Sequence, residues 1–562
     1  IFGRVLDPQS AAVAGANLTV RNVDTGVALR YTTNTSGYYE ANLLLPGNYE
    51  ITVEMTGFKK LVRMGITLPV ASRLDVPLLL EVGGVTETIS VTAEAPLLET
   101  NAVSQGRVME NKSVMELPIM GNSAILLVKL APGIQTGGVN NYLALHSNVG
   151  GSDYSVAGNI GGNSWTLDGS PNNGPSRRLA YLPYTDAIAE FKVETSNFDA
   201  SIGQSSGAAI TMISKSGTNE IHGTATWQHW QQRWHGAPFF VKQQYYNRIA
   251  AADAAGNTAL ANQLRNTDKQ TTGRSNNWGA SAGGPVVIPK LVNGRNKLFW
   301  FFTYNAFKDV KTEDPSTFNR TVPTLNARQG NFSDMLGLTN GVTRFTVYDP
   351  TTIRRDPARP NNFLRDPFPA NTIPRNRFAN PAYDFVTKLY PNPNVSLAAN
   401  QDPVNNYLAS QTPYNWDYKA YSNRVDYQIS NRWRAFGRWS YNNFGPEDRA
   451  DWTYETARGL NLNGLVRNNK GGNIDVVWTQ TPTTLWNFNV GINQFREGNI
   501  QPKLREFKPS DLGLPAYLDQ KAGDRSIIPQ MAVNGYTTIS PANLSTWTRS
   551  RQMTAKVEFT HI

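Results

Sequence analysis

Polar and apolar residues alternate with a period of two over many short stretches of the chain, which is the pattern of β-strands whose two faces meet different surroundings. Residues 485–494 show it most clearly, because Trp486, Phe488, Val490 and Ile492 alternate with Asn487, Asn489, Gly491 and Asn493. Residues 433–441 show it as well, with Phe436 as the exception. The pattern predicts a protein that is mainly β.

After residue 220, the alternation predicts about eight long strands. They cover residues 223–230, 278–288, 298–308, 421–430, 433–441, 473–480, 485–494 and 553–561. In a soluble sandwich the apolar faces would pack inward, whereas in a membrane barrel they would face lipid around a polar lumen. The length of the strands and the Trp and Tyr residues near their ends favour an antiparallel transmembrane β-barrel.

A barrel of the class that holds a plug has about 22 strands. We therefore expect the barrel to be partial, with sequence missing after Ile562, and the true N-terminus before Ile1 to be missing as well. An open sheet of this kind has unpaired edges and, as an isolated piece, is not expected to insert stably into a membrane.

Seven short alternating runs separated by turn residues fill residues 1–85 and predict a β-sandwich. The runs are residues 1–6, 16–22, 28–33, 38–43, 47–54, 61–68 and 73–80. The strings GRVLD at residues 3–7, GANLTV at 15–20 and LPGNY at 45–49 resemble the carboxypeptidase regulatory-like domain. The resemblance implies a transthyretin-like, carbohydrate-binding-like fold. It implies no peptidase, because a zinc carboxypeptidase needs His and Glu ligands and this stretch has no histidine. A structural or docking role and sugar binding both remain open.

A β-prone linker follows at residues 86–96. Its central residues, Thr88, Ile89, Ser90, Val91, Thr92 and Ala93, resemble a TonB box. The resemblance implies that this segment binds a TonB-type energy-transducing protein of the inner membrane, offering an extended, unpaired strand to the edge of a partner sheet. The alternative is that these residues form the last strand of the sandwich.

Residues 97–220 resemble the plug domain of Oar-like TonB-dependent receptors. The resemblance is carried by MELPIMG at residues 115–121, SWTLDGS at 164–170, IAEFKVET at 188–195, DASIGQSSGAAI at 199–210 and SKSGTNE at 214–220. Ile125, Leu126, Leu127 and Leu130 predict one apolar face of a short helix that ends before Pro132. The chain is thus expected to continue from a mixed α/β plug into an incomplete outer-membrane β-barrel at residues 221–562.

A long region rich in Pro, Asn and Arg, about residues 310–417, interrupts the predicted strands. It resembles an extracellular loop of the same family. Long loops in compact proteins are usually functional or disordered, and ligand capture is our preferred role for this one.

The composition narrows the functional classes. No apolar run approaches the ~18 residues that a membrane-spanning helix needs. The net charge of +10 comes from scattered basic residues, which argues against nucleic-acid binding. With no cysteine, the chain has no disulfides and no Cys-based zinc site.

The remaining candidate chemistry is sparse. The five histidines, His146, His222, His229, His235 and His561, form no metal-binding motif, and the His229–His235 stretch among tryptophans is best explained by interfacial residues of a first barrel strand. Residues 203–207 fit the G-x-S-x-G pattern of serine hydrolases, but that elbow needs a following helix, whereas residues 208–214 predict a strand. No motif places a pair of acids. We predict no catalytic site, no metal site and no cofactor.

The family resemblance implies energy-coupled import of a bulky solute, such as an oligosaccharide, a peptide or a chelate, across the outer membrane of a diderm bacterium. It implies a barrel surrounded by outer-membrane lipid and a sandwich in the periplasm. The alternative, from a different functional class, is an outer-membrane-anchored adhesion or polysaccharide-binding structural protein.

Overall fold

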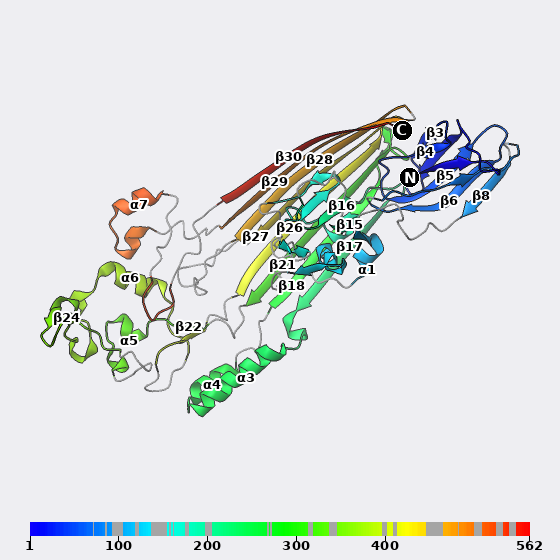
Figure 1. Ribbon diagram of the computed structural model, residues 1–562. Helices are drawn as coiled ribbons and strands as arrows, with labels where there is room; N and C mark the ends of the chain where they lie inside the picture. Colours follow the sequence, from blue (N-terminus) through cyan, green and yellow to red (C-terminus); the bar gives the residue numbers. More distant parts are fainter. Residues whose placement is uncertain are drawn as a thin grey trace.

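A computed structural model describes most of the chain (Figure 1). The described residues are 1–70, 72–84, 87–92, 105–117, 123–136, 154–156, 159–160, 162–174, 179–196, 205–266, 269, 273–312, 319–336, 345–395, 402–408, 413–445, 465–481, 483–499, 508–523, 532–538 and 547–561.

The first part of the chain is a sandwich of two sheets. Its strands are β1 (Phe2–Leu6), β2 (Asn17–Asn22), β3 (Ala28–Thr32), β4 (Tyr38–Glu40), β5 (Gly47–Glu54), β6 (Lys60–Leu68), β7 (Leu78–Leu79) and β8 (Thr88–Thr92). One sheet has the order β4-β1-β7 and the other β3-β2-β5-β6-β8. Alternate residues of β5, including Ile51 and Val53, are fully buried between the sheets. The alternation that predicted the strands therefore also builds the core.

A second, mixed unit follows. Its elements are β9 (Gln105–Glu110), α1 (Asn111–Glu116), η2 (Ala124–Leu130), β10 (Ile134–Thr136), β11 (Tyr154–Val156), β12 (Asn159–Ile160), β13 (Ser164–Leu167), β14 (Ser170–Pro171), η4 (Thr185–Ala187), β15 (Ile188–Ser196) and β16 (Ala209–Ser214). The main sheet has the order β14-β13-β16-β15-β9. We call this unit the plug, because it lies against the inner face of the long strands that follow (Figure 1).

The predicted short helix of the plug forms as the 3-10 helix η2, and its buried face differs from the predicted one. Ala124, Ile125, Leu127 and Val128 are buried, whereas Leu130 is 45% exposed. The difference arises because a 3-10 helix has three residues per turn, which brings a different set of side chains to one side.

Eight long strands form one antiparallel sheet in sequence order. They are β17 (His222–Gln231), β18 (Gly273–Pro285), β21 (Leu298–Thr312), β26 (Pro413–Gln428), β27 (Trp433–Gly445), β28 (Leu465–Thr481), β29 (Thr484–Asn499) and β30 (Trp547–His561). All eight predicted strands are present. Among the described residues, the edge strands β17 and β30 are not paired with each other, so the barrel is partial.

The two faces of this sheet decide between the two interpretations of its alternation. On β29, Asn487 and Asn489 are buried, whereas Phe488 and Val490 are 37% and 55% exposed. A soluble sandwich would bury the apolar face, so the observed arrangement is that of a membrane barrel with apolar residues outside and polar residues inside. The polar residues are buried because the plug covers them.

The two ends of the barrel strands differ. One end carries short connections, such as residues 429–432 between β26 and β27, and the sandwich lies next to it (Figure 1). The other end carries the long connections. Outer-membrane barrels show the same contrast between short turns and longer loops, and we call the long connections the outer loops.

The described residues of three long connections form short helices and strands. Between β17 and β18 lie η5 (Gln232–Trp234), α3 (Phe239–Ala254) and α4 (Thr258–Arg265). Between β21 and β26 lie β22 (Asn319–Arg320), α5 (Leu325–Arg328), η6 (Ser333–Met335), η7 (Pro350–Thr352), β23 (Arg354–Asp356), β24 (Arg359–Leu364), η8 (Pro369–Asn371), η9 (Arg375–Arg377), α6 (Asn380–Leu389) and β25 (Tyr407–Leu408). Between β29 and β30 lie η13 (Pro509–Leu512) and α7 (Tyr517–Ala522), while β19 (Val287–Ile288) and β20 (Val292–Asn293) form the short hairpin between β18 and β21. In the part of the chain that the structure describes, no helix has the length and apolarity required to cross a membrane.

Candidate functional site at the junction of plug, barrel and sandwich

A tight turn of the plug carries a buried carboxylate. Asp168 and Gly169 connect β13 to β14 as a two-residue hairpin loop, and their φ angles are 51° and 79°. An Asp-Gly pair suits this turn, because both positions need positive φ and glycine adopts it without steric cost. The turn places Asp168 against the barrel wall, where it is only 5% exposed.

Two barrel arginines hold that carboxylate. Asp168 Oδ1 lies 3.0 Å from Arg424 Nη1, and Asp168 Oδ2 lies 2.8 Å from Arg438 Nε. Ser214 of the plug also donates to Asp168, through its backbone N–H and its hydroxyl, at 2.8 Å each. Arg424 in turn donates to Asp426, with Nη2 2.8 Å from Oδ1. Two carboxylates therefore balance two guanidinium groups, and the cluster holds no net charge.

The register of the barrel explains why this cluster needs the plug. Arg424 of β26 is paired directly with Arg438 of β27. Like charges opposite each other on neighbouring strands repel, and buried charges without partners are costly. Asp168 supplies the counter-charge from a different part of the chain. We call Asp168, Arg424, Arg438 and Asp426 the buried ion cluster.

Hydrogen bonds between uncharged groups also join the plug to the barrel next to the buried ion cluster. Ser170 donates from its hydroxyl to Asn473 Oδ1 at 2.7 Å, and Asn473 Nδ2 donates to the Asp168 carbonyl at 2.8 Å. Ser170 also fits against Gly491, where an added Cβ would fall 2.2 Å from its hydroxyl oxygen. The hairpin of β13 and β14 is thus hydrogen-bonded to β28 and packed against β29.

A second tie joins the plug to the first barrel strands. Asp186 of η4 accepts hydrogen bonds from the Thr224 hydroxyl at 2.7 Å and from the Ser281 hydroxyl, and it pairs with Lys215 at 2.6 Å. Burial alone would raise the pKa of Asp186, but the hydrogen bonds from Lys215, Ser281 and Thr224 outweigh burial and lower the pKa below its ordinary value. Asp186 is therefore held in its charged form.

The sandwich contacts both other units. The Val70 N–H donates to the plug carboxylate Glu190 at 2.7 Å. Asn219, at the end of the plug, donates to the Thr25 carbonyl at 2.6 Å and to Asn296 Oδ1 at 2.7 Å. Asn219 thereby joins a sandwich turn to the short connection before β21.

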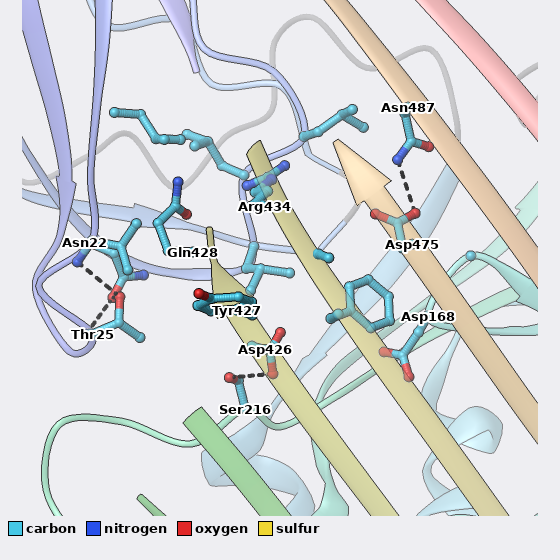
Figure 2. A pocket seen from close by; sticks show the side chains of 18 of the residues that line it. Asn22, Thr25, Asp168, Ser216, Asp426, Tyr427, Gln428, Arg434, Asp475 and Asn487 are labelled. Carbon is cyan, nitrogen blue, oxygen red and sulfur yellow. Dashed lines mark hydrogen bonds between the residues drawn. The ribbon is translucent and has the colours of Figure 1, made fainter. Parts of the chain in front are cut away.

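A cavity of about 320 Å³ lies where the three units meet. Its apolar side comes from the sandwich, with Leu43, Leu44 and Leu45 among the lining residues. Figure 2 shows Asn22 and Thr25 of the sandwich on one side and Asp168, Asp426 and Asp475 on the other, with Arg434 between them. The Ser216 hydroxyl donates to Asp426 Oδ2 at 2.7 Å, and Asn487 Nδ2 donates to Asp475 Oδ2 at 3.0 Å. The cavity is therefore lined by residues of all three units, and beside it the Ser216–Asp426 hydrogen bond joins the plug to the barrel.

The TonB-box-like segment has a defined place next to this junction. Thr88–Thr92 form β8, the edge strand of the larger sandwich sheet, paired in parallel with β6 from Lys60↔Thr88 to Met64↔Thr92. Ile89 and Val91 pack on the sandwich core. The segment thus occupies the position of a last sandwich strand, and it is paired on one side instead of unpaired. Ala93 lies outside the described residues.

The other sequence candidates are not brought together. His222, His229, His235 and His561 lie on or next to the edge strands β17 and β30, and His146 is outside the described residues. His229 packs edge-on against Trp234, with 5.3 Å between the ring centroids. Among the described residues, no group of three His, Asp or Glu side chains is arranged to hold a metal ion. Ser205, in the hydrolase-like string, donates to the Ala208 carbonyl at 3.0 Å and is followed by strand β16, not by a helix, while Gly203 and Gln204 lie outside the described residues.

Sequence reasoning missed the buried ion cluster, although a signal for it exists. Arg424 and Arg438 occupy inward-facing positions on consecutive predicted strands, and Asp168-Gly169 is a strong hairpin string. Two inward arginines at one level of a barrel call for an acid from whatever fills the lumen.

Comparison with known proteins agrees with this architecture. Residues 213–561 match the family described as outer membrane beta barrel domain. The chain belongs to this family of outer-membrane β-barrels. Residues 1–81 match the carboxypeptidase regulatory-like domain. The family places this barrel protein in the outer membrane.

A curated relative extends the comparison. The barrel protein is 25% identical over 332 residues to the TonB-dependent transporter Oar of Myxococcus xanthus, which covers 57% of this chain and 27% of the relative. The chain thus spans about a quarter of the length of that relative.

Solved structures give a weaker likeness. The outer membrane transporter YddB of Escherichia coli matches with 9% identity and a TM-score of 0.40, covering 71% of this chain and 40% of that one. The siderophore receptor PirA of Acinetobacter baumannii matches with 12% identity and a TM-score of 0.38, covering 81% and 44%. The ferric enterobactin receptor PfeA of Pseudomonas aeruginosa matches with 10% identity and a TM-score of 0.35, covering 70% and 41%.

Proposed function

We propose that this protein is an energy-coupled outer-membrane receptor and transporter, which imports a bulky solute and draws its energy from a TonB-type protein of the inner membrane. The observation that carries the proposal is the plug, which is folded against the inner face of the barrel strands and held there by the buried ion cluster. The homology to a TonB-dependent transporter supports the energy source. The protein has no enzymatic role in this proposal.

The ion pairs between plug and barrel are suited to a plug that must move. Buried ion pairs contribute little net free energy, because the cost of removing the charges from water offsets their attraction. They nevertheless fix one geometry, since an incorrectly placed plug would leave Arg424 and Arg438 with only the carboxylate of Asp426 as counter-charge. Water that enters the opened lumen rehydrates the same groups, so the ties define a closed state without making it irreversible.

The energy input is proposed to act at Thr88–Ala93. In the part of the chain that the structure describes, β8 pairs with β6 alone, so its other edge can accept a strand of the partner protein. The chain then leads from β8 to β9, the edge strand of the plug sheet. A pull on β8 is therefore transmitted along the chain to the plug. We also propose the corresponding division of the chain into sandwich (1–85), linker (86–96), plug (97–220) and barrel (221–562), with the sandwich in the periplasm.

Cysteine cross-linking tests the proposed partner site, and the chain offers a clean background because it contains no cysteine. Ser90→Cys places a thiol on exposed β8, and Ser36→Cys places one on an exposed sandwich turn as the matched control. With a TonB-type protein that carries one cysteine, we expect a disulfide-linked product from Ser90→Cys only. Adding Ile89→Pro, which removes a backbone donor from the strand, should abolish it.

Two outcomes would contradict the proposal. Equal cross-linking at Ser90→Cys and Ser36→Cys would show that β8 is not the docking strand. No cross-link at either position, together with solute uptake that does not respond to dissipation of the proton gradient, would favour the adhesion or polysaccharide-binding alternative.

A further inference from the structure

A second cavity, of about 370 Å³, lies among the outer loops and far from the junction described above. Its walls come from two different connections, the one between β21 and β26 and the one between β29 and β30. In Figure 1 the elements of these connections, β22, α5, α6 and α7, lie at the end of the strands opposite the sandwich. Nothing in the proposed transport mechanism requires this cavity.

Hydrogen bonds join the two connections into one body. Thr321 and Thr537 are linked twice, with the Thr537 N–H donating to the Thr321 carbonyl and the Thr321 N–H donating to the Thr537 hydroxyl, each at 2.9 Å. The Tyr390 hydroxyl donates to the Thr537 carbonyl at 2.7 Å. These contacts hold Val533 and Tyr536 at the cavity as lining residues opposite α5 and α6.

Local features of the chain around α5 also shape the wall of the cavity. Thr324 caps the N-terminus of α5 by accepting a hydrogen bond from the Ala327 N–H at 3.1 Å. Gly330 follows with a φ of 77°, and a Cβ there would fall 2.5 Å from the Phe378 ring. Glycine at this position therefore lets the Phe378 ring lie directly against the backbone of the wall.

The cavity is aromatic. Five of its lining residues carry rings: Phe332, Phe378, Tyr383, Tyr390 and Tyr536. Aliphatic atoms of Ala327, Ala382, Val386 and Val533 complete much of the remaining surface. Aromatic pairs prefer offset or edge-to-face contacts and gain about 0.5–1.5 kcal/mol beyond the area they bury. A ring inside this cavity has partners for such contacts on several sides.

The N–H donors of the two arginines at the wall are largely occupied. Arg328 donates to backbone carbonyls, from Nη1 to Val386 and Tyr390 at 3.2 and 3.1 Å and from Nε to Pro323 at 3.3 Å, and its Nη2 donates to Pro391. Arg377 is bound to both carboxylate oxygens of Asp349, at 3.0 and 2.7 Å. Asp349 neutralises Arg377, whereas Arg328 keeps its charge but has four of its five N–H donors occupied by carbonyls. A ligand carboxylate would therefore lose its hydration for at most one hydrogen bond to Arg328.

We infer that this cavity is a binding site for an uncharged aromatic group of one or two fused rings. The size agrees, since a cavity of about 150 Å³ already holds benzene. The occupant is a planar aromatic molecule, or the aromatic end of a larger one, captured by the outer loops. The inference stands independently of the energy coupling proposed above, because binding to the loops needs no partner protein.

Fluorine NMR of 5-fluoroindole with the purified protein in detergent micelles tests this site. We expect saturable broadening of the probe signal. Ala382→Trp and Val533→Trp each fill the cavity from a different connection, and each should weaken binding by at least about tenfold. Ala358→Trp adds the same ring at an exposed position between β23 and β24 and should leave binding unchanged, which also corrects for partition into micelles.

The two filling variants keep the test decisive if one of them fails to fold, which circular dichroism of the purified proteins would reveal. Unchanged binding in a folded Ala382→Trp or Val533→Trp variant would overturn the assignment of the site. The 5-fluoro derivative of indole-3-carboxylate, which adds a negative charge, should bind at least about tenfold more weakly than 5-fluoroindole. Tighter binding of the carboxylate would overturn the inference of an uncharged ligand.

Discussion

Arg424 and Arg438 stand directly opposite each other on neighbouring barrel strands, and the carboxylate that lies within 3.0 Å of both belongs to Asp168 of the plug. The barrel wall thus carries a buried pair of like charges, for which its own Asp426 supplies one counter-charge and the inserted plug supplies the other. This dependence makes the plug position testable by removing a single charge.

Asp168→Asn should loosen the plug without unfolding the barrel. The amide keeps the shape of the side chain but leaves two buried guanidinium groups with one carboxylate, and removing one partner of a buried pair costs about 3–5 kcal/mol. Hydrogen exchange of the plug strand β13 (Ser164–Leu167) measures the effect, and its protection should fall by about a hundredfold or more.

The control uses an exposed pair of the same kind. Asp253 and Arg265 lie 2.6 Å apart in the helices α3 and α4, with side chains 43% and 47% exposed. Asp253→Asn should change stability by less than about 1 kcal/mol. If β13 keeps its full protection in Asp168→Asn, the buried ion cluster does not hold the plug.

Gly491→Ala should displace the plug hairpin by steric contact alone. The new Cβ would lie 2.2 Å from the Ser170 hydroxyl oxygen and 2.7 Å from its Cβ, and overpacking of this kind costs about 1–3 kcal/mol. Gly437→Ala is the matched control, because no atom lies within 4 Å of a Cβ on that barrel glycine. Thermal unfolding of both variants checks the difference, and Ser170→Gly should restore the stability of Gly491→Ala. A Gly491→Ala protein as stable as Gly437→Ala would argue against the observed plug position.

Gly330→Ala should destabilise the aromatic cavity of the outer loops. Two effects add at this position, because the φ of 77° disfavours any side chain and the Cβ would meet the Phe378 ring. Gly256→Ala, at a φ of 68° with open space around it, experiences only the backbone effect of about 1 kcal/mol. Hydrogen exchange in α6 (Asn380–Leu389) should therefore accelerate more in the first variant than α4 exchange does in the second. Equal effects would mean that Phe378 does not pack against this turn.

The local pattern of polar and apolar residues predicted much more of the fold than of the candidate site. The alternation of Asn487 and Asn489 with Phe488 and Val490 is visible in the sequence, and so are all eight barrel strands. The length of the strands and the aromatic residues near their ends already favoured a barrel over a sandwich. Which face is buried became known only from the structure, because the plug that covers the polar face lies hundreds of residues away in the sequence.

The buried ion cluster was not predicted, because its residues also lie far apart in the sequence. Asp168 and Arg424 are separated by 256 residues, and no spacing rule connects them. Strand pairing had to be known before Arg424 and Arg438 could be placed opposite each other. The folded outer loops were missed because their order rests on long-range contacts such as Thr321 with Thr537, which leave no periodic signal. A contact of this long-range kind also joins the sandwich to the plug, between Val70 and Glu190.

Glu190 should make the protein less stable as the pH rises. Burial raises the pKa of this carboxyl above its ordinary value of 4.5, and the nearby Glu110 adds to the shift, against the opposing hydrogen bond from the Val70 N–H. The folded protein therefore holds this proton to higher pH than the unfolded chain does. The stability contributed by the group is complete below about pH 4.5 and is lost as the pH rises through the raised pKa. Glu190→Gln cannot titrate, so its free energy of unfolding should lack this decrease. Melting temperatures of both proteins from about pH 4 to about pH 8 measure the difference.

Glu110→Gln removes the neighbouring charge, and its pH dependence should fall between the other two. Parallel curves for the wild-type protein and Glu190→Gln would show instead that the carboxyl is hydrated and that the sandwich does not press on the plug at this point.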